Sequence, residues 1–216
     1  MKVDVCLYGH IFADTIYTKT GERRAWGGIA NVARYLDKDL SVQLEPTSFC
    51  HSVIVDYKGK SGVTSYDEIR RIVPDHEATW MHFCYVDKAK EVPDTHCLRS
   101  DVVTTDSVDS PAQMDIDCNF GSGIDAIYHG CTQWKHDRIG GLLITDGHIY
   151  QHQTKPKMDI QVLGAGDMLV AACINYHFKC GYKSFQPSKR LVDFCHEQVE
   201  EWLYERDHIG SAGWSS

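Results

Sequence analysis

The 216-residue sequence lacks any long apolar segment and any pair of cysteines at C-x-x-C spacing. Because no run of 18 apolar residues occurs, the sequence predicts no transmembrane helix. The first ten residues, MKVDVCLYGH, are too short and too polar for a signal peptide. We therefore expect a cytoplasmic protein that has no membrane partner.

Positive charge is also scarce. Lys and Arg number 22 against 30 Asp and Glu, so the net charge is −8. A general nucleic-acid-binding protein usually carries the opposite sign, and no nucleic-acid partner is predicted. An anionic ligand such as a nucleotide would have to be held by local groups and not by the overall field of the protein.

The nine cysteines and twelve histidines do not follow the spacing of known metal sites. Cys6 and Cys173 lie in apolar runs, which is typical of buried free thiols in a reducing compartment. There is no H-E-x-x-H, and His148 and His152 lie in a segment with the character of a strand or loop. The sequence therefore predicts no metal-ligating residues.

The pattern of apolar residues favours a single α/β domain over residues 1–216. Hydrophobic residues make up 43% and charged residues 24% of the chain, which is an ordinary globular composition. Strands are expected at residues 3–8, 80–86, 101–105, 126–128 and 141–145, and helices at 27–36, 66–72, 168–178 and 188–206. Because strands and helices alternate, we predict a three-layer sandwich: a mostly parallel central sheet covered by helices on both faces. Two hairpins are expected at residues 15–26 and 52–62.

Two nucleotide-binding motifs are incomplete or misplaced. Gly59-Lys60-Ser61 ends like a Walker A loop, but Ile54 stands where the loop needs its first glycine. Residues 121–126 match the dinucleotide pattern G-x-G-x-x-A, yet they follow a polar stretch and not a first strand. A surface turn is the preferred interpretation of this segment, and a dinucleotide enzyme is the alternative.

The GAGD sequence before the helix at 168–178 is a stronger candidate for a phosphate-binding site than the two motifs above. Its residues are Gly164, Ala165, Gly166 and Asp167. Glycines at a helix start let successive N–H groups converge on one point, which forms an anion hole suited to a transferring phosphoryl group. A carboxylate in the first turn can accept a proton from an attacking hydroxyl. The alternative is a simple helix cap after a turn.

Three segments together resemble the ribokinase-like (PfkB) family of small-molecule kinases. They are the first strand with Gly9 and Asp14, the Gly27-Gly28-x-x-Asn31 helix start, and GAGD near the C-terminus. The sequence Gly-Gly-x-Ala-Asn-Val-Ala is most similar to the heptose-phosphate kinase branch. Leu142–Gly147 is similar to the family's strand that ends in Thr-x-Gly.

The resemblance implies a role for each matched residue. Asp167 would be the general base, and the Gly164–Gly166 amides would form the anion hole. The acceptor hydroxyls would be bound by Asp14, Gly27, Gly28 and Asn31, and the nucleotide would lie beside Thr145 and Gly147. The resemblance further implies ATP and Mg²⁺ as cofactors, a sugar-like substrate, and a small β lid formed by about residues 15–25 and 50–64. Open edges of lid strands would allow a homodimer.

Two departures from the family pattern leave a second function open. Members of the family have Asp-Thr-x before GAGD, where this chain has Gln161, Val162 and Leu163. The family's Asn-x-x-Glu is absent, and residues 129–132 stand in its place without a carboxylate. The ligands of Mg²⁺ are therefore unassigned. The sequence predicts a kinase for a sugar, sugar phosphate or nucleoside, with a catalytically weak ligand-binding or regulatory protein as the alternative.

Overall fold

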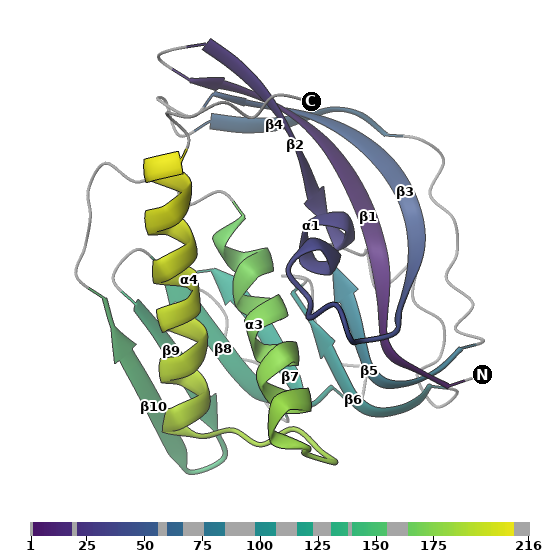
Figure 1. Ribbon diagram of the computed structural model, residues 1–216, viewed down its shortest axis with the longest axis vertical. Helices are drawn as coiled ribbons and strands as arrows, with labels where there is room; N and C mark the ends of the chain where they lie inside the picture. The colour runs from purple at the N-terminus through teal and green to yellow at the C-terminus, as the bar shows by residue number, and fades with distance from the viewer. Residues whose placement is uncertain are drawn as a thin grey trace.

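One mixed β-sheet runs through the molecule, and three helices pack against it (Figure 1). The computed structural model describes residues 2–18, 21–55, 60–66, 76–84, 98–106, 116–122, 131–137, 140–154 and 164–209. The strands are β1 (Lys2–Thr18), β2 (Gly21–Gly28), β3 (Val42–Val55), β4 (Lys60–Tyr66), β5 (Glu77–Cys84), β6 (Arg99–Thr105), β7 (Cys118–Ser122), β8 (Thr132–Asp137), β9 (Gly140–Thr145) and β10 (His148–Gln153). The helices are α1 (Ile29–Arg34), α3 (Ala165–Cys180) and α4 (Lys189–Ile209).

The centre of the sheet is parallel, as the sequence predicts. The strand order is β10-β9-β8-β7-β6-β5-β1-β3-β4, and the six strands from β8 to β3 are parallel to one another. Strands β9 and β10 continue the sheet as an antiparallel hairpin after β8. The alternation of apolar segments therefore gives a mainly parallel mixed sheet with helices.

The three described helices lie on one face of the sheet (Figure 1). The core on this face joins strand residues such as Leu7, Trp80 and Trp134 to the buried side of α3 and α4. The opposite face has its own buried cluster, which contains Tyr8, Met81 and Phe83. No helix in the described part of the chain covers that second face, so the expected third layer stays a prediction.

Local sequence explains where α3 and α4 begin and end. Gly164 and Gly181 both have left-handed backbone angles and stand at the two ends of α3. α4 begins after Ser188, whose Oγ accepts a hydrogen bond from the Leu191 N–H at 3.2 Å. None of the helices in the described part combines the length and apolar character that a bilayer-spanning segment needs.

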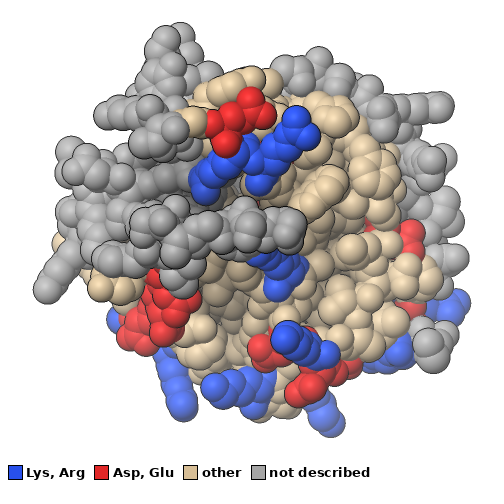
Figure 2. Space-filling view, turned by 45° about the horizontal axis from the view of Figure 1, so that its top comes forward, with Lys and Arg blue, Asp and Glu red and all other residues tan. Residues whose placement is uncertain are grey.

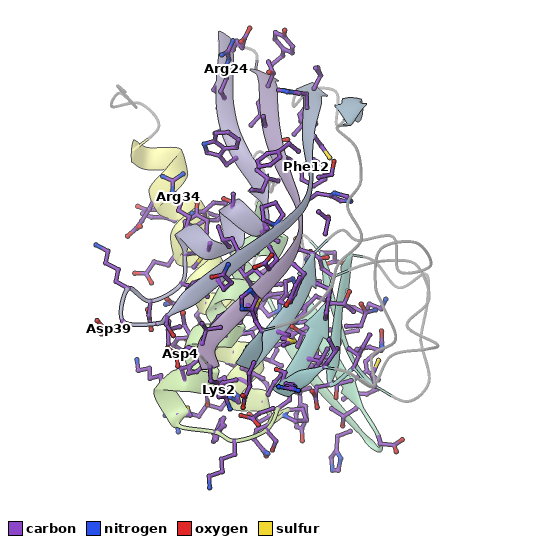
Figure 3. The ribbon with its side chains drawn as sticks, turned by 90° about the vertical axis from the view of Figure 1, so that its right-hand side faces the viewer. Lys2, Asp4, Phe12, Arg24, Arg34 and Asp39 are labelled. Atoms are coloured by element: carbon purple, nitrogen blue, oxygen red, sulfur yellow. The ribbon has the colours of Figure 1, made fainter. Side chains whose placement is uncertain are left out.

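Strands β1 and β3 are longer than the core of the sheet requires and continue into a four-stranded extension of it. β1 pairs with β5 only as far as Gly9, and from Ile11 onward it pairs with β2. Because β3 continues beside β1 and pairs with β4, the extension has the order β2-β1-β3-β4. Figure 3 shows β1 rising from Lys2 past Phe12 toward Arg24 of β2. We call this four-stranded extension, from Ile11 onward in β1, the lid sheet.

The structure corrects two local predictions. Tyr66, expected to start a helix, ends strand β4, and the rest of that segment lies outside the described residues. Gly121, expected in a surface turn, lies in β7 opposite Lys135 of β8. A glycine within a buried parallel strand cannot start a dinucleotide-binding helix, and Ala126 lies outside the described residues.

Candidate active site

Gly9 is the point at which β1 leaves the central sheet. Its φ is +146°, and a Cβ placed there would lie 1.9 Å from the carbonyl oxygen of Cys84. Only glycine fits this close approach between β1 and β5. Beyond it, β1 turns into the lid sheet and carries Asp14 past the carboxyl ends of the parallel strands, where ligands bind in open α/β sheets.

Gly27 and Gly28 join the lid sheet to α1. A Cβ on Gly27 would lie 2.8 Å from Asp14 Oδ2, and one on Gly28 would lie 2.2 Å from the carbonyl oxygen of His10. Gly28 also has a φ of +65°, which favours glycine. The two glycines therefore let β2 end beside β1, and they place Asn31 in the short helix that follows.

Asn31 connects α1 to the GAGD segment. Its amide Nδ2 donates a hydrogen bond of 2.7 Å to Asp167 Oδ2, and both side chains are buried. A Cβ on Gly164 would lie 3.0 Å from the same amide nitrogen, so the glycine leaves room for Asn31. Residues that are 136 positions apart in sequence thus meet at the first turn of α3.

The buried carboxyl group of Asp167 has a pKa close to neutral pH. Burial raises its pKa from 3.8 to about 7; the Asn31 hydrogen bond opposes this rise, and the charges of Asp106 and Asp14 add to it. Its second oxygen, Oδ1, is buried and has no hydrogen-bond partner among the described residues. A buried carboxylate oxygen without a partner is suited to receive a hydroxyl proton from a ligand.

Asp14 lies near enough to Asp167 for its charge to act on that carboxyl group. Its Oδ1 accepts a hydrogen bond from Ser52 Oγ of β3. Burial raises the pKa of Asp14, and the bond from Ser52 opposes the rise. Asp14 is therefore a carboxylate fixed in position at the base of the lid sheet, as a residue that binds polyol hydroxyls must be.

The glycines of GAGD stand at the N-terminus of a 16-residue helix. The first amides of such a helix have no partners within it, and the helix dipole favours an anion there. His136 of β8 lies beside this point, because a Cβ on Gly166 would be 3.4 Å from its Cε1. Burial lowers the pKa of His136, which favours a neutral ring next to the helix start.

The structure brings together most of the residues that the sequence singled out. They are Asp14, Gly27, Gly28, Asn31, Gly164, Ala165, Gly166 and Asp167. It adds others that the sequence analysis missed, namely Ser52, His82, Cys84, Asp106 and His136. Cys84, Asp106 and His136 stand within one residue of a strand's carboxyl end, which is a positional signal available in the sequence once the strands are known.

Thr145 and Gly147 lie apart from this cluster, and their assignment to the nucleotide stays a prediction. β9 runs antiparallel to β8, so Thr145 lies beside the start of β8 whereas His136 lies near its end. Thr145 Oγ1 instead donates to the carbonyl of His148 within the β9–β10 turn. In Figure 1 this turn and the N-terminus of α3 lie at opposite ends of the sheet.

Residues 129–130 and 161–163, where the family carboxylates are missing, lie outside the described residues.

Several solved structures with a similar fold are kinases of the ribokinase family. A fructokinase from Vibrio cholerae O395 with bound fructose, ADP and calcium matches with a TM-score of 0.63 at 13% identity, over 94% of this chain and 92% of that one. A pyrophosphate-dependent kinase in the ribokinase family, in complex with a pyrophosphate analogue and myo-inositol, matches with a TM-score of 0.60 at 11% identity, over 88% and 92%.

Sequence comparison alone does not detect this similarity. No protein-family model matches it, and no curated protein matches it by sequence. At 11–13% identity the likeness shows the fold alone. This chain has the fold of the ribokinase-family kinases. The buried Asn31–Asp167 hydrogen bond lies near the carboxyl ends of its parallel strands.

Proposed function

We propose that the protein transfers the γ-phosphoryl group of ATP to a hydroxyl of a sugar, sugar phosphate or nucleoside. The observation that carries this proposal is Asp167: it is buried, Asn31 holds one of its oxygens, and the other has no partner among the described residues. A pKa of about 7 matches a general base that works near neutral pH.

The steps follow from these groups. The acceptor hydroxyl binds between Asp14 and Asn31 and gives its proton to Asp167 Oδ1 as its oxygen attacks the γ-phosphorus. A bond forms between the acceptor oxygen and phosphorus, and the bond from phosphorus to the β–γ bridging oxygen breaks, so ADP leaves. The amides of Gly164–Gly166 lie where negative charge on the transferring group would be stabilised.

Mg²⁺ would accompany the nucleotide, and the residues present fit it in part. Mg²⁺ is usually held by substrate phosphates with one or two carboxylates. Asp137, an exposed carboxylate that follows His136 at the end of β8, is the side chain that we assign to it. When bound, the ion would supply positive charge that offsets the charge of the transferring phosphates.

The missing carboxylates favour a second candidate function. Gln161, Val162 and Leu163 provide no acidic residue before GAGD, and Thr145 lies away from the cluster. A protein that binds a sugar-like ligand and turns over slowly or not at all is compatible with these features. An intact Asp167 favours the enzyme, because a pure binding protein has little need of a buried carboxylate beside an anion hole.

A donor and acceptor panel separates the two candidates. Release of ADP from ATP, and of phosphate from pyrophosphate, would be measured against sugars, sugar phosphates, inositols and nucleosides, with and without Mg²⁺. The enzyme predicts acceptor-dependent and Mg²⁺-dependent release for at least one pair. Thermal stabilisation by an acceptor without any release, across the whole panel, would leave the binding protein as the function.

We further propose that the lid sheet forms a homodimer in the cytoplasm. Tyr17, Trp26 and Phe49 are 42%, 61% and 49% exposed, and strand register places them on the lid face opposite Asp14. Apolar side chains grouped on one face favour a protein partner. On the face shown in Figure 2, acidic and basic side chains are interspersed. Light scattering should give a dimer, and Trp26→Glu should give a monomer.

A further inference from the structure

A second cluster of reactive side chains lies beside the candidate active site. His82 and Cys84 are two residues apart in β5, so their side chains leave the same face of the sheet. Asp106 directly follows the neighbouring strand β6, and its N–H donates to the carbonyl of Phe83 at 3.2 Å. One ligand atom from each of the three side chains lies within 4.8 Å of the others.

The hydrogen bonds around His82 allow the tautomer that a metal ligand needs. Thr104 Oγ1 accepts from Trp80 Nε1 at 2.9 Å and lies 3.4 Å from the carbonyl of Met81, to which it can donate its single hydrogen. In that arrangement His82 Nδ1, 2.9 Å from Thr104 Oγ1, is the donor to the hydroxyl oxygen. The neutral ring then has a lone pair on Nε2, which is the nitrogen 3.8 Å from Asp106 Oδ2.

That lone pair has nothing to bind among the described residues. His82 is fully buried, and its Nε2 has no hydrogen-bond partner in the described part of the chain. Asp106 Oδ2 lies 3.8 Å away, and two acceptors cannot satisfy each other. A buried nitrogen lone pair, oriented through its other nitrogen by a hydroxyl, has the arrangement of a metal-ligating histidine.

Cys84 and Asp106 supply the remaining ligand atoms. Cys84 Sγ lies 3.1 Å from Asp106 Oδ2 and donates to it. Around a tetrahedral zinc ion, ligand distances of about 2.0–2.3 Å place the ligand atoms about 3.3–3.8 Å apart. The S–O separation of 3.1 Å and the N–O separation of 3.8 Å are close to that range.

We propose that His82, Cys84 and Asp106 form a binding site for a divalent late transition metal, Zn²⁺ in the first instance. The thiolate and the carboxylate together neutralise the two charges of the ion, which suits a buried position. One sulfur, one nitrogen and one oxygen ligand favour Zn²⁺ over Mg²⁺ or Ca²⁺, which prefer oxygen alone. Three protein ligands leave the fourth position open to water or another small ligand.

The site is tested by titrating the chelator-treated whole protein with Co²⁺ in place of Zn²⁺, without nucleotide or sugar. A thiolate-to-cobalt charge-transfer band should appear, saturate at one equivalent and disappear when Zn²⁺ is added. Cys84→Ser should abolish the band, and His82→Gln and Asp106→Asn should weaken Co²⁺ binding by roughly 10-fold or more. Because no phosphoryl transfer is measured, the result is independent of the proposed kinase activity.

Two cysteine controls distinguish this site from adventitious binding. Cys180→Ser removes an exposed thiol and Cys118→Ser a buried one, and neither should change the band. If Cys84→Ser does not fold, the comparison uses Asp106→Asn, because the Asp106 side chain is 12% exposed and keeps its size. Zn²⁺ should then raise the melting temperature of the wild type and not that of Asp106→Asn. The proposal is overturned by an absent band, by a band that survives in Cys84→Ser, or by equal Zn²⁺ stabilisation of both proteins.

Discussion

The two sides of the candidate site differ in how completely the described residues build them. On the acceptor side, Asp14, Asn31 and Asp167 come from three elements and are held by specific hydrogen bonds. On the donor side, GAGD and His136 are in place, whereas Thr145 points to the other end of the sheet. Under the proposed function, acceptor binding and proton transfer would depend on a preformed cluster, and donor binding would depend on fewer of the residues that the sequence predicted.

Removing the base should have the largest effect. Asp167→Asn keeps the size of the side chain and an oxygen for the Asn31 amide, but it cannot accept the hydroxyl proton. Turnover should fall by roughly 10²–10⁴-fold while the acceptor KM changes little, because the lost interaction acts in the transition state. Steady-state ADP release measures both constants. A fully active Asp167→Asn protein would show that GAGD is only a helix start here.

Asp14→Asn should weaken the acceptor more than it slows the chemistry. The carboxylate is held by Ser52 and can pair with acceptor hydroxyls before and during the reaction alike. Loss of a charged hydrogen bond of about 1.5–3 kcal/mol should raise the acceptor KM roughly 10–100-fold, with a smaller loss of kcat. Ser52→Ala is the matched control, because it frees Asp14 without removing its charge. A larger effect on kcat than on KM would contradict this prediction and would show that Asp14 takes part in the chemical step.

The same comparison shows what the sequence could and could not predict. Glycines at positions 9, 27, 28 and 164 are predictable site markers. Gly9 and Gly28 lie against backbone carbonyls, Gly164 has a left-handed φ, and Gly27 leaves room for the Asp14 side chain. The parallel sheet was also predictable, because β5 is apolar on both faces. The position of Thr145 away from the cluster was not predictable, because a Thr-x-Gly pattern does not reveal strand direction and β9 is antiparallel to β8.

Side chains that gain their role through neighbours were not predictable. Asp106 and His82 are joined by the pairing of β5 with β6, and a residue spacing of 24 gives no sign of it. His136 likewise acquires its place only when α3 begins beside the end of β8. The sequence contains the local signal, a polar residue at a strand end, but the partner depends on strand order.

The raised pKa of Asp167 predicts a stability effect of intermediate size. Between pH 3.8 and about 7 the folded protein keeps this proton and the unfolded chain releases it, so the group's contribution to stability falls as the pH rises. Asp167→Asn removes this cost. The variant should have a free energy of unfolding roughly 1–3 kcal/mol above the wild type at pH 8, and a much smaller difference at pH 4. Urea unfolding at both pH values measures the differences. A variant that is less stable at pH 8 would contradict a buried, destabilised carboxylate.

The smallest effect is expected where the sequence placed the nucleotide. Thr145→Val removes one hydroxyl, whose bond to the His148 carbonyl is 3.5 Å long and exposed, and it keeps the shape of the side chain. Because Thr145 pairs with the start of β8 and not with its end, the KM for ATP should stay within about twofold of the wild type, and the free energy of unfolding should change by less than about 0.5 kcal/mol.

His136→Gln gives the contrast, because it alters the group beside Gly166. It should raise the KM for the phosphoryl donor and leave the KM for the acceptor nearly unchanged. If Thr145→Val raised the KM for ATP tenfold and His136→Gln did not, the donor would lie at the β9–β10 turn. Asp167 and the GAGD amides would then be too far from the γ-phosphate to act on it.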